Sequence, residues 1–374
     1  MEEKMTKKIT FFHPYFIYGG VEKTNIRLAK YFIEHGYLVE FMALSFSDHL
    51  KEEMDEIGIT RVSLKAGRTM NAIGEIREYM VNESKKYQLT FISCQNYANL
   101  TAIFARPKKC GSMKLIISER SNPTEFQYGS SSVRKGKLIL FLMKHFYKKA
   151  DVILANSRET AEMITEISGK RADYIYNPTL SEPFDKMAEE SVEFPWQGND
   201  IPTIIAVGRL VASKGYRDLL EAFTLMRKHI KANLLILGEG EQRTELEQII
   251  QKNGITESVW LPGYDSNPYK YMAKASLFVM TSYYEGLPNV LIEACALKIP
   301  CVSTRCKSGP KEILSEGKGG YLVELGNITE LANTMEYALT HQEETAAKAA
   351  YAYKHLDRFT PQEVGKKYLE VIEA

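Results

Sequence analysis

The chain of 374 residues is poor in the features that mark secreted proteins, membrane-spanning proteins and proteins stabilised by a structural metal ion. Its five cysteines are odd in number and lack C-x-x-C spacing, which argues against a disulfide framework and a zinc site. The longest apolar run, residues 138–143, falls far short of the roughly 20 residues that span a bilayer. No apolar stretch with a cleavage site opens the chain, so no signal peptide is indicated. We therefore expect a cytoplasmic protein.

Other sequence signatures are also missing. G-x-G-x-x-G does not occur, which argues against a nicotinamide-dependent oxidoreductase. No motif for nucleic-acid binding is present, and we expect no nucleic-acid partner. What is present is the composition of a globular protein, 44% hydrophobic and 25% charged. Residues 1–180 hold 27 Lys and Arg against 20 Asp and Glu, whereas the remainder holds 21 against 27. This asymmetry indicates that one half faces an anionic surface or substrate.

The length favours two domains, and short apolar runs alternate with helical patterns in two series. The first series predicts strands at residues 9–13, 38–43, 89–93, 114–118 and 151–154, with helices such as 21–34 and 133–148 between them. The second predicts strands at residues 203–207, 234–237, 258–261, 276–280 and 300–303. Such alternation predicts βαβ crossovers and parallel sheets. A proline-rich linker, residues 177–202, separates the domains, which we place at 1–180 and 181–359.

A glycine pair follows the first predicted strand. Gly19 and Gly20 lie in a loop just before a predicted helix. Glycines at a helix N-terminus let backbone N–H groups approach an anion closely. A simple tight turn explains the pair equally well, so the pair alone does not decide between the two interpretations.

Two cations follow the first strand of the second series. Arg209 and Lys214 lie between that strand and the next predicted helix, within the run Gly208–Gly215. At the edge of a sheet they would neutralise a diphosphate and stabilise the charge that grows on a departing nucleotide. The alternative is a pair of solvated surface cations, and the position at a strand end favours the ligand.

The most informative stretch is residues 276–296. A strand ends near Met280, a loop carries Glu285, and Pro288 suits the first position of a helix that contains Glu293. The two carboxylates can therefore contact different parts of one extended ligand. Carboxylates accept hydrogen bonds from vicinal diols, and N–H groups at the helix start meet phosphate or sugar hydroxyls. A structural salt bridge remains an equally good interpretation of Glu293.

Together these segments resemble the large family 4 of retaining glycosyltransferases, over nearly the whole chain. The resemblance rests on Gly19-Gly20, Gly208-Arg209-Leu210, Lys214-Gly215, Gly238-Glu239-Gly240 and, above all, Glu285-Gly286-Leu287-Pro288 through Glu293, which match the family's E-x7-E signature. It implies the α/β GT-B fold, in which two Rossmann-like domains with parallel sheets face a central cleft. It also implies that a C-terminal helix, about 360–374, packs back on the first domain.

The resemblance also implies roles for individual residues. Arg209 and Lys214 would bind the donor diphosphate, Glu285 would contact the donor sugar, and Glu293 would contact the ribose. The other expected donor-binding residues are Gly19, Gly20, Gly238, Tyr264, Gly286, Leu287, Pro288, Asn289 and Val290. Relatives often carry a catalytic His where this chain has Arg120, so we assign no general base and expect Arg120 to stabilise phosphate charge. D-x-D is absent, which fits the metal independence typical of this fold.

A basic segment suggests where the acceptor lies. Residues 133–149 contain six cations and no acidic residue. A basic amphipathic helix can rest on anionic lipid, whereas a helix that faces the core with a solvated basic face is the alternative. Residues 117–123 and 285–314 look most like bacterial enzymes that extend lipid-linked or surface glycans, such as lipopolysaccharide or capsule. We expect peripheral contact with the inner face of the cytoplasmic membrane.

The residues and the resemblance together imply a retaining, metal-independent hexosyltransferase. It would move a hexose or N-acetylhexosamine from a nucleoside-diphosphate sugar, a UDP-sugar, to a glycan acceptor on polyprenyl diphosphate, with no cofactor besides the nucleotide sugar. Two alternatives remain open. One is a nucleotide-sugar 2-epimerase of the same fold, which the pair Glu285 and Glu293 disfavours. The other is a non-catalytic nucleotide-sugar-binding protein.

Overall fold

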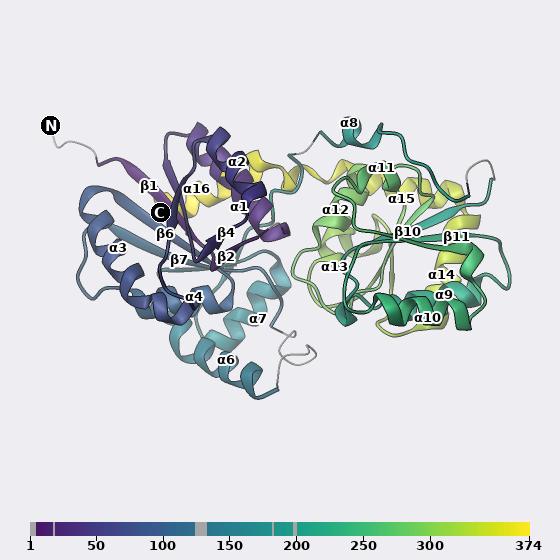
Figure 1. Ribbon diagram of the computed structural model, residues 1–374, viewed down its shortest axis with the longest axis horizontal. Coiled ribbons are helices and arrows are strands. Elements are labelled where there is room, and N and C mark those ends of the chain that lie inside the picture. The colour runs from purple at the N-terminus through teal and green to yellow at the C-terminus, as the bar shows by residue number, and fades with distance from the viewer. Residues whose placement is uncertain (1–4, 18, 124–132, 182, 197–199) are drawn as a thin grey trace. The chain divides into compact units, whose positions relative to one another are not determined.

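The computed structural model describes residues 5–17, 19–123, 133–181, 183–196 and 200–374 (Figure 1). The chain divides into two compact units. The N-terminal unit comprises Met1–Ser181 and Phe359–Ala374, and the C-terminal unit comprises Glu182–Arg358. Each unit is built on one main parallel β-sheet with helices packed against it, as the alternation of predicted strands and helices requires.

The main sheet of the N-terminal unit has the strand order β5-β3-β1-β6-β7-β8-β9, and its described pairings are parallel. Its strands are β1 (Lys7–Phe12), β3 (Leu38–Ala43), β5 (Thr60–Ser63), β6 (Gln88–Cys94), β7 (Met113–Glu119), β8 (Val152–Ala155) and β9 (Asp173–Tyr174). Its helices are α1 (Gly20–Glu34), α2 (Asp48–Ile57), α3 (Ile73–Lys86), α4 (Asn96–Ala105), α6 (Val133–Phe146), α7 (Arg158–Ser168) and α16 (Pro361–Glu373). The short strands β2 (Tyr15–Phe16) and β4 (Ser45–Phe46) form a separate pair.

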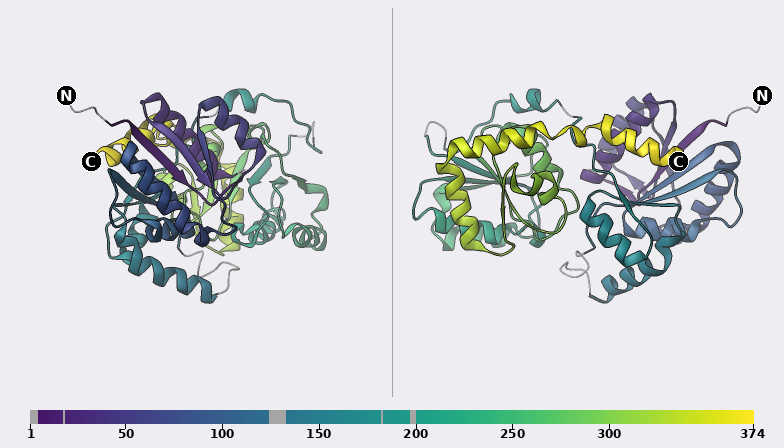
Figure 2. Two further views of the ribbon diagram at one scale, coloured as in Figure 1. Left: turned by 60° about the vertical axis from the view of Figure 1, so that its left-hand side comes forward. Right: turned by 180° about the vertical axis from the view of Figure 1, so that it is seen from behind.

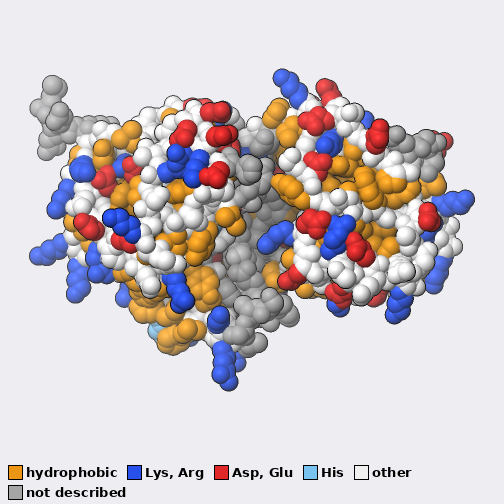
Figure 3. All heavy atoms as spheres, in the orientation of Figure 1, with side chains coloured by type: hydrophobic (Ala, Val, Ile, Leu, Met, Phe, Trp, Pro, Cys, Tyr) orange, Lys and Arg blue, Asp and Glu red, His pale blue; other side chains and the backbone are white. Residues whose placement is uncertain are grey.

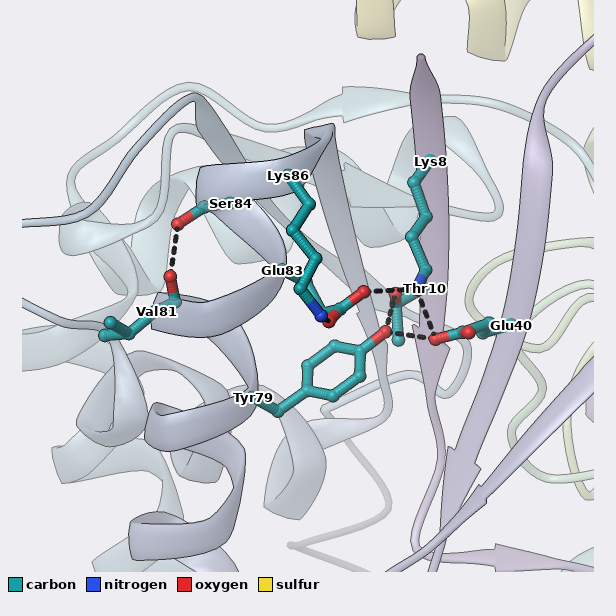
Figure 4. A network of polar contacts seen from close by, with 8 residues as sticks. All are labelled: Lys8, Thr10, Glu40, Tyr79, Val81, Glu83, Ser84 and Lys86. Atoms are coloured by element: carbon teal, nitrogen blue, oxygen red, sulfur yellow. Dashed lines mark hydrogen bonds and ion pairs between the residues drawn. The ribbon is translucent and has the colours of Figure 1, made fainter. Parts of the chain in front are cut away.

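A buried ionic network joins two strands of this sheet to a helix (Figure 4). Lys8 Nζ on β1 lies 2.8 Å from Glu40 Oε2 on β3 and 2.6 Å from Glu83 Oε2 on α3. The hydroxyl of Tyr79, also on α3, donates a hydrogen bond to Glu40. Burial raises the pKa of the Glu83 carboxyl, but hydrogen bonds from Lys8 and a neighbouring lysine outweigh burial and leave that pKa lowered. Because a buried charge without its partner is costly, the network fixes α3 to β1 and β3.

The last helix of the chain belongs to the N-terminal unit (Figure 2). Helix α16 (Pro361–Glu373) begins after Thr360, whose side chain accepts a hydrogen bond from the third residue of the helix. It packs against α1 so closely that a Cβ on Gly365 would lie 2.2 Å from the ring of Tyr31. At its other end, Lys114 Nζ donates hydrogen bonds to two carbonyl oxygens of the last turn. These contacts complement the negative end of the helix dipole.

The main sheet of the C-terminal unit has the strand order β12-β11-β10-β13-β14-β15, and its described pairings are parallel. Its strands are β10 (Thr203–Val207), β11 (Asn233–Leu237), β12 (Val259–Gly263), β13 (Leu277–Met280), β14 (Cys301–Thr304) and β15 (Tyr321–Val323). Its helices are α8 (Phe184–Ala188), α9 (Tyr216–Met226), α10 (Arg243–Lys252), α11 (Tyr269–Met272), α12 (Asn289–Ala296), α13 (Pro310–Ile313), α14 (Ile328–Thr340) and α15 (Gln342–Lys354). Strand β11 is wholly buried, as a parallel strand covered on both faces must be.

Residues 177–181 of the segment expected to be a linker belong to the N-terminal unit, and the described part of the segment from residue 183 onward packs on the C-terminal unit. It contains the short helix α8, and Asn267 Nδ2 donates a 2.8 Å hydrogen bond to the carbonyl of Met187 in that helix. Further along, Trp196 Nε1 donates a 3.0 Å hydrogen bond to the carbonyl of Glu257. The proline-rich composition therefore marks a segment held by its neighbours through side-chain to backbone contacts.

Candidate active site

Two loops of the C-terminal unit meet at the carboxyl edge of its sheet. Strands β10 and β13 are hydrogen-bonded neighbours and run parallel, so the loops that follow them leave the same edge. The Thr281 hydroxyl donates a 2.8 Å hydrogen bond to the carbonyl of Lys214, and the Tyr283 amide donates one to the carbonyl of Ser213. Gly215 has a φ of +65°, and a Cβ there would lie 2.2 Å from the Thr281 oxygen. The close approach of the loops therefore requires glycine at this position.

This contact brings together two of the predicted site residues. Lys214 Nζ lies 2.6 Å from Glu285 Oε1, and Ser282 Oγ donates a 2.6 Å hydrogen bond to the same oxygen. The side chains of Lys214 and Glu285 are 22% and 13% exposed, so solvent screens the pair only partly. Burial raises the pKa of the adjacent Tyr216 hydroxyl, and the negative charge of Glu285 raises it further. The arrangement sets one cation and one carboxylate side by side at the sheet edge.

Arg209 lies on the same loop as Lys214, directly after the glycine that follows β10. Its side chain is exposed, and no ion pair is found for its guanidinium among the residues that the structure describes. The loop after β11 supports this position, because a Cβ on Gly238 would lie 2.0 Å from the carbonyl oxygen of Gly208. The Leu210 amide also donates a 2.8 Å hydrogen bond to the carbonyl of Glu239. Gly238 thus allows the loop after β11 to contact the backbone of Gly208. A direct role of Gly238 in donor binding stays a prediction.

The E-x7-E segment spans the loop after β13 and helix α12. Gly286, Leu287 and Pro288 are buried, and the helix begins at Asn289, one residue later than Pro288 suggests from the sequence. Asn289, Val290 and Glu293 are partly buried, whereas the buried residues of the helix are Leu291, Ile292, Ala294 and Cys295. Tyr264, which follows β12, is 63% exposed. The structure therefore places Glu285 and Glu293 on one loop-helix segment.

The predicted residues of the N-terminal unit lie at the carboxyl ends of β1 and β7. Gly19 caps α1 and Gly20 begins it. In the first turn of α1, Glu22 is 5% exposed, and burial raises the pKa of its carboxyl to about 7. His13 Nδ1 lies 3.4 Å from Glu22 Oε1 and 2.8 Å from the carbonyl of Tyr15. The sequence reasoning missed His13 and Glu22, although a His at a strand end and a Glu after paired glycines were visible signals.

Arg120 lies in the interior of the N-terminal unit, with 6% exposure. Its guanidinium donates a 2.8 Å hydrogen bond to Asn177 Oδ1 and a 3.0 Å hydrogen bond to the hydroxyl of Tyr368 on α16. Its positive charge and the burial of His13 both lower the pKa of that imidazole, with burial the larger cause. These contacts favour a role in organising the interior, and stabilisation of phosphate charge by Arg120 stays a prediction.

Comparison with solved structures defines the class of fold. The chain is similar to HepE of Anabaena in complex with UDP, with a TM-score of 0.78, 19% identity and coverage of 98% of this chain and 99% of that one. It is also similar to a sucrose-phosphate synthase of Thermosynechococcus elongatus, with a TM-score of 0.79, 17% identity and coverage of 98% of each chain. Two units of this kind, each on a parallel sheet, make the GT-B fold of glycosyltransferases.

Sequence relatives and family models then define the family. An uncharacterized glycosyltransferase of Methanocaldococcus jannaschii is 34% identical over 208 residues, 54% of this chain and 50% of the relative's length. The N-acetylgalactosamine-N,N'-diacetylbacillosaminyl-diphospho-undecaprenol 4-alpha-N-acetylgalactosaminyltransferase of Campylobacter jejuni is 33% identical over 273 residues, 71% of this chain and 70% of the relative. Residues 18–179 match the model for Glycosyltransferase Family 4, and residues 189–355 match Glycosyl transferases group 1. The chain belongs to this family of glycosyltransferases.

Proposed function

We propose that this protein moves a hexose or N-acetylhexosamine from a UDP-sugar to a glycan acceptor on polyprenyl diphosphate, with retention of anomeric configuration and without a metal ion. The observation that carries the proposal is the pair of Lys214 and Glu285 at the sheet edge, 2.6 Å apart and beside the exposed Arg209. Two cations and a carboxylate there match a donor with a diphosphate at one end and a sugar at the other. HepE, whose fold this chain shares, was solved with UDP and glucose, which supports the choice of nucleotide.

Each residue has a distinct task in this proposal. Arg209 and Lys214 stabilise the negative charge that develops on the diphosphate as its bond to the sugar C1 breaks. An acceptor hydroxyl oxygen forms the new bond to C1, and its proton passes to an oxygen of the departing diphosphate. Glu285 accepts hydrogen bonds from sugar hydroxyls once the diphosphate takes over Lys214, and Glu293 does the same for the ribose. In the free protein, the ion pair with Lys214 holds the Glu285 carboxylate ready at this edge.

The acceptor and the membrane contact are proposed from α6 (Val133–Phe146) and from a relative. The printed name of the Campylobacter jejuni relative specifies a diphospho-undecaprenol acceptor. Leu138 and Phe141 on α6 are 57% and 56% exposed. The exposed cations around them are Arg134, Lys135, Lys137, Lys144, Lys148 and Lys149. In Figure 3, orange and blue side chains adjoin at the end of the N-terminal unit where Figure 1 places α6. Apolar side chains ringed by cations suit an anionic bilayer.

No helix among the described residues has the length and apolarity needed to cross a bilayer. We propose peripheral contact through α6 from its exposed apolar and cationic side chains.

A panel of nucleotide sugars tests the proposal. Melting temperature is measured with UDP-glucose, UDP-galactose, their N-acetylated forms, the GDP- and ADP-sugars, UDP and NAD. A ligand at 100 times its Kd adds about 2.7 kcal/mol to the free energy of unfolding. The strongest donor is then incubated with and without a short polyprenyl-diphosphate glycan, and the product anomer is identified by NMR.

The outcomes separate the alternatives. Transfer that needs the acceptor and yields the donor's own anomeric configuration supports the proposal. Isomerisation of the nucleotide sugar without an acceptor would instead identify an epimerase, and binding without any turnover would identify a nucleotide-sugar-binding protein. Stabilisation by none of the nucleotide sugars would overturn the proposal.

A further inference from the structure

Ser308, in the loop that follows β14, holds an uncommon backbone conformation beside the loop that carries Glu285. Its φ is +63°, in the left-handed region that residues with a side chain seldom adopt, and Gly309 follows at +89°. The Ser308 side chain is fully buried, with 0% exposure. A strained residue of this kind persists only where surrounding contacts hold it, and such residues gather at functional sites.

Two hydrogen bonds join Ser308 to the loop that carries Glu285. Its Oγ lies 2.6 Å from the carbonyl oxygen of Glu285 and 3.0 Å from that of Gly286, and its single proton is donated to these acceptors. Gly309 lets the two loops approach, because a Cβ there would lie 2.4 Å from Pro288 Cδ. The Glu285 loop is therefore held by hydrogen bonds from Ser308 and packs closely against Gly309.

A second hydroxyl, at the end of β14, anchors the Glu285 loop at Ser282, three residues before Glu285. Thr304, the last residue of β14, donates a 2.7 Å hydrogen bond from Oγ1 to the carbonyl oxygen of Ser282. Ser282 in turn donates from its own hydroxyl to the Glu285 carboxylate. Both anchors hold backbone carbonyls, so they set the path of the main chain on either side of Glu285.

Anchoring a carbonyl oxygen also orients the amide of the same peptide. Every described peptide bond is trans, and in a planar trans peptide the C=O and N–H bonds point in opposite directions. When Ser308 holds the oxygen of Glu285, the N–H of Gly286 therefore points away from Ser308. Glycine has no side chain to fix its backbone, so without this bond Gly286 would sample many orientations.

We propose that Ser308 is a positioning residue that presets the Gly286 amide and the Glu285 carboxylate for the donor sugar. The proposal rests on the proposed function of the site. Glycine at position 308 would adopt the observed φ without strain, yet the chain carries a residue that strains the backbone and supplies a hydroxyl. The hydroxyl is therefore the property that position 308 provides. Ser308 acts through Glu285 and Gly286, and its effect falls on the sugar end of the donor.

The test compares Ser308→Gly and Ser308→Ala with the wild type. Both variants lose the hydroxyl, but only Ser308→Gly relieves the strained φ, so it keeps the loop foldable. A matched control is Ser303→Ala, which removes another fully buried hydroxyl, one that donates to the carbonyl of Thr304. Calorimetry measures the Kd of UDP and of the UDP-sugar that gives the largest thermal shift. Steady-state kinetics gives KM and kcat for the same donor.

We expect both Ser308 variants to bind the UDP-sugar about three- to tenfold more weakly, as for loss of one hydrogen bond. Free UDP lacks the sugar, so its Kd should change less than twofold. The control should keep both constants. Wild-type donor affinity in Ser308→Gly, or equal loss of UDP and UDP-sugar affinity in both variants, would overturn the proposal.

A failure of the proposed function has a different signature. If the wild type binds no nucleotide sugar in the panel, the donor site itself is wrong and the role of Ser308 falls with it. If Glu285→Gln weakens the UDP-sugar while Ser308→Gly does not, the donor site stands and only the role of Ser308 is lost.

Discussion

Lys214 Nζ lies 2.6 Å from Glu285 Oε1 across loops that are 71 residues apart in the chain. The ion pair is only partly exposed, and each partner compensates the charge of the other. Substitution of one partner therefore acts on both, because it leaves an uncompensated charge at the sheet edge. Effects on binding and turnover should not add when both residues are changed.

Loss of either cation should slow turnover. We expect Lys214→Ala and Arg209→Ala to lower kcat/KM by roughly 10²-fold or more, as for removal of a preorganised charge stabiliser. The double variant Lys214→Ala with Glu285→Ala should lose less than the product of the two single losses, because the second change removes the unpaired carboxylate. Initial rates at saturating acceptor measure these effects, and Lys252→Ala, at the exposed end of α10, is the control. Near-normal turnover in either single variant would remove that cation from the mechanism.

The two glutamates should separate by which part of the donor they bind. Glu293→Gln should weaken both free UDP and the UDP-sugar by roughly ten- to a hundredfold, the loss of a charge-assisted bond of about 1.5–3 kcal/mol. Glu285→Gln should spare free UDP and lower transfer, because its contact belongs to the sugar. Calorimetry with both ligands measures this, after a melting scan shows that each variant is folded. The opposite pattern would reverse the two roles.

Much of the fold could be predicted from the sequence, because the order of strands and helices along the chain follows from local patterns of apolar residues. Each predicted strand is present within two residues of its expected bounds, and the predicted helix at residues 21–34 is α1. Strands β2, β4, β5, β9 and β15 were missed, since each is four residues or shorter and partly exposed, which leaves little apolar periodicity. The E-x7-E segment was found because both glutamates lie in one continuous stretch of the sequence, where their spacing can be counted.

Apart from the packing of the C-terminal helix on the first domain, which the resemblance implied, the sequence did not predict the contacts that join distant segments. The pairing of Lys214 with Glu285 depends on the neighbouring positions of β10 and β13. The burial of Arg120 depends on Tyr368, which reaches it from α16 at the other end of the chain. Ser308 gives no local signal at all, because its φ and its acceptors exist only in the folded unit. Strand periodicity does not carry information of this kind.

Activity should survive removal of divalent metal ions. In the proposed site, Arg209 and Lys214 supply the positive charge that a metal ion would otherwise bring to the diphosphate. Turnover in excess EDTA should equal turnover in buffer alone, and added Mg²⁺ or Mn²⁺ should leave it unchanged. Inactivation by EDTA with rescue by either ion would contradict the proposed mechanism.

The buried Glu22 should make stability depend on pH. Burial raises its pKa to about 7 from an ordinary value of 4.5, so the folded chain keeps a proton that the unfolded chain releases. The resulting stabilisation, about 3 kcal/mol, is complete below pH 4.5 and is lost as pH rises through about 7. Gln at position 22 cannot ionise. The melting temperature of Glu22→Gln, relative to that of the wild type, should therefore rise from pH 5 to pH 8. An equal difference in melting temperature between the two proteins at pH 5 and at pH 8 would contradict the expectation.

Contact with a membrane should depend on both kinds of side chain on α6. The exposed Leu138 and Phe141 give apolar area that can enter the acyl boundary, and the cations around them contribute about 1 kcal/mol each near an anionic surface. We expect the protein to bind vesicles that contain phosphatidylglycerol and to be released as salt rises, because salt screens the cationic contribution. Co-sedimentation at increasing NaCl measures this, with pure phosphatidylcholine vesicles as the neutral reference.

Two sets of variants separate the apolar from the electrostatic contribution to vesicle binding. Changing Lys144, Lys148 and Lys149 together to Gln should weaken binding to anionic vesicles and flatten its salt dependence. Changing Leu138 and Phe141 to Ser should weaken binding at every salt concentration and leave the slope unchanged, because the cations remain. Neither set touches the donor site, so both should bind UDP-sugar in solution like the wild type. Equal binding to neutral and anionic vesicles, or no binding to either, would reduce α6 to an ordinary helix with a solvated basic face.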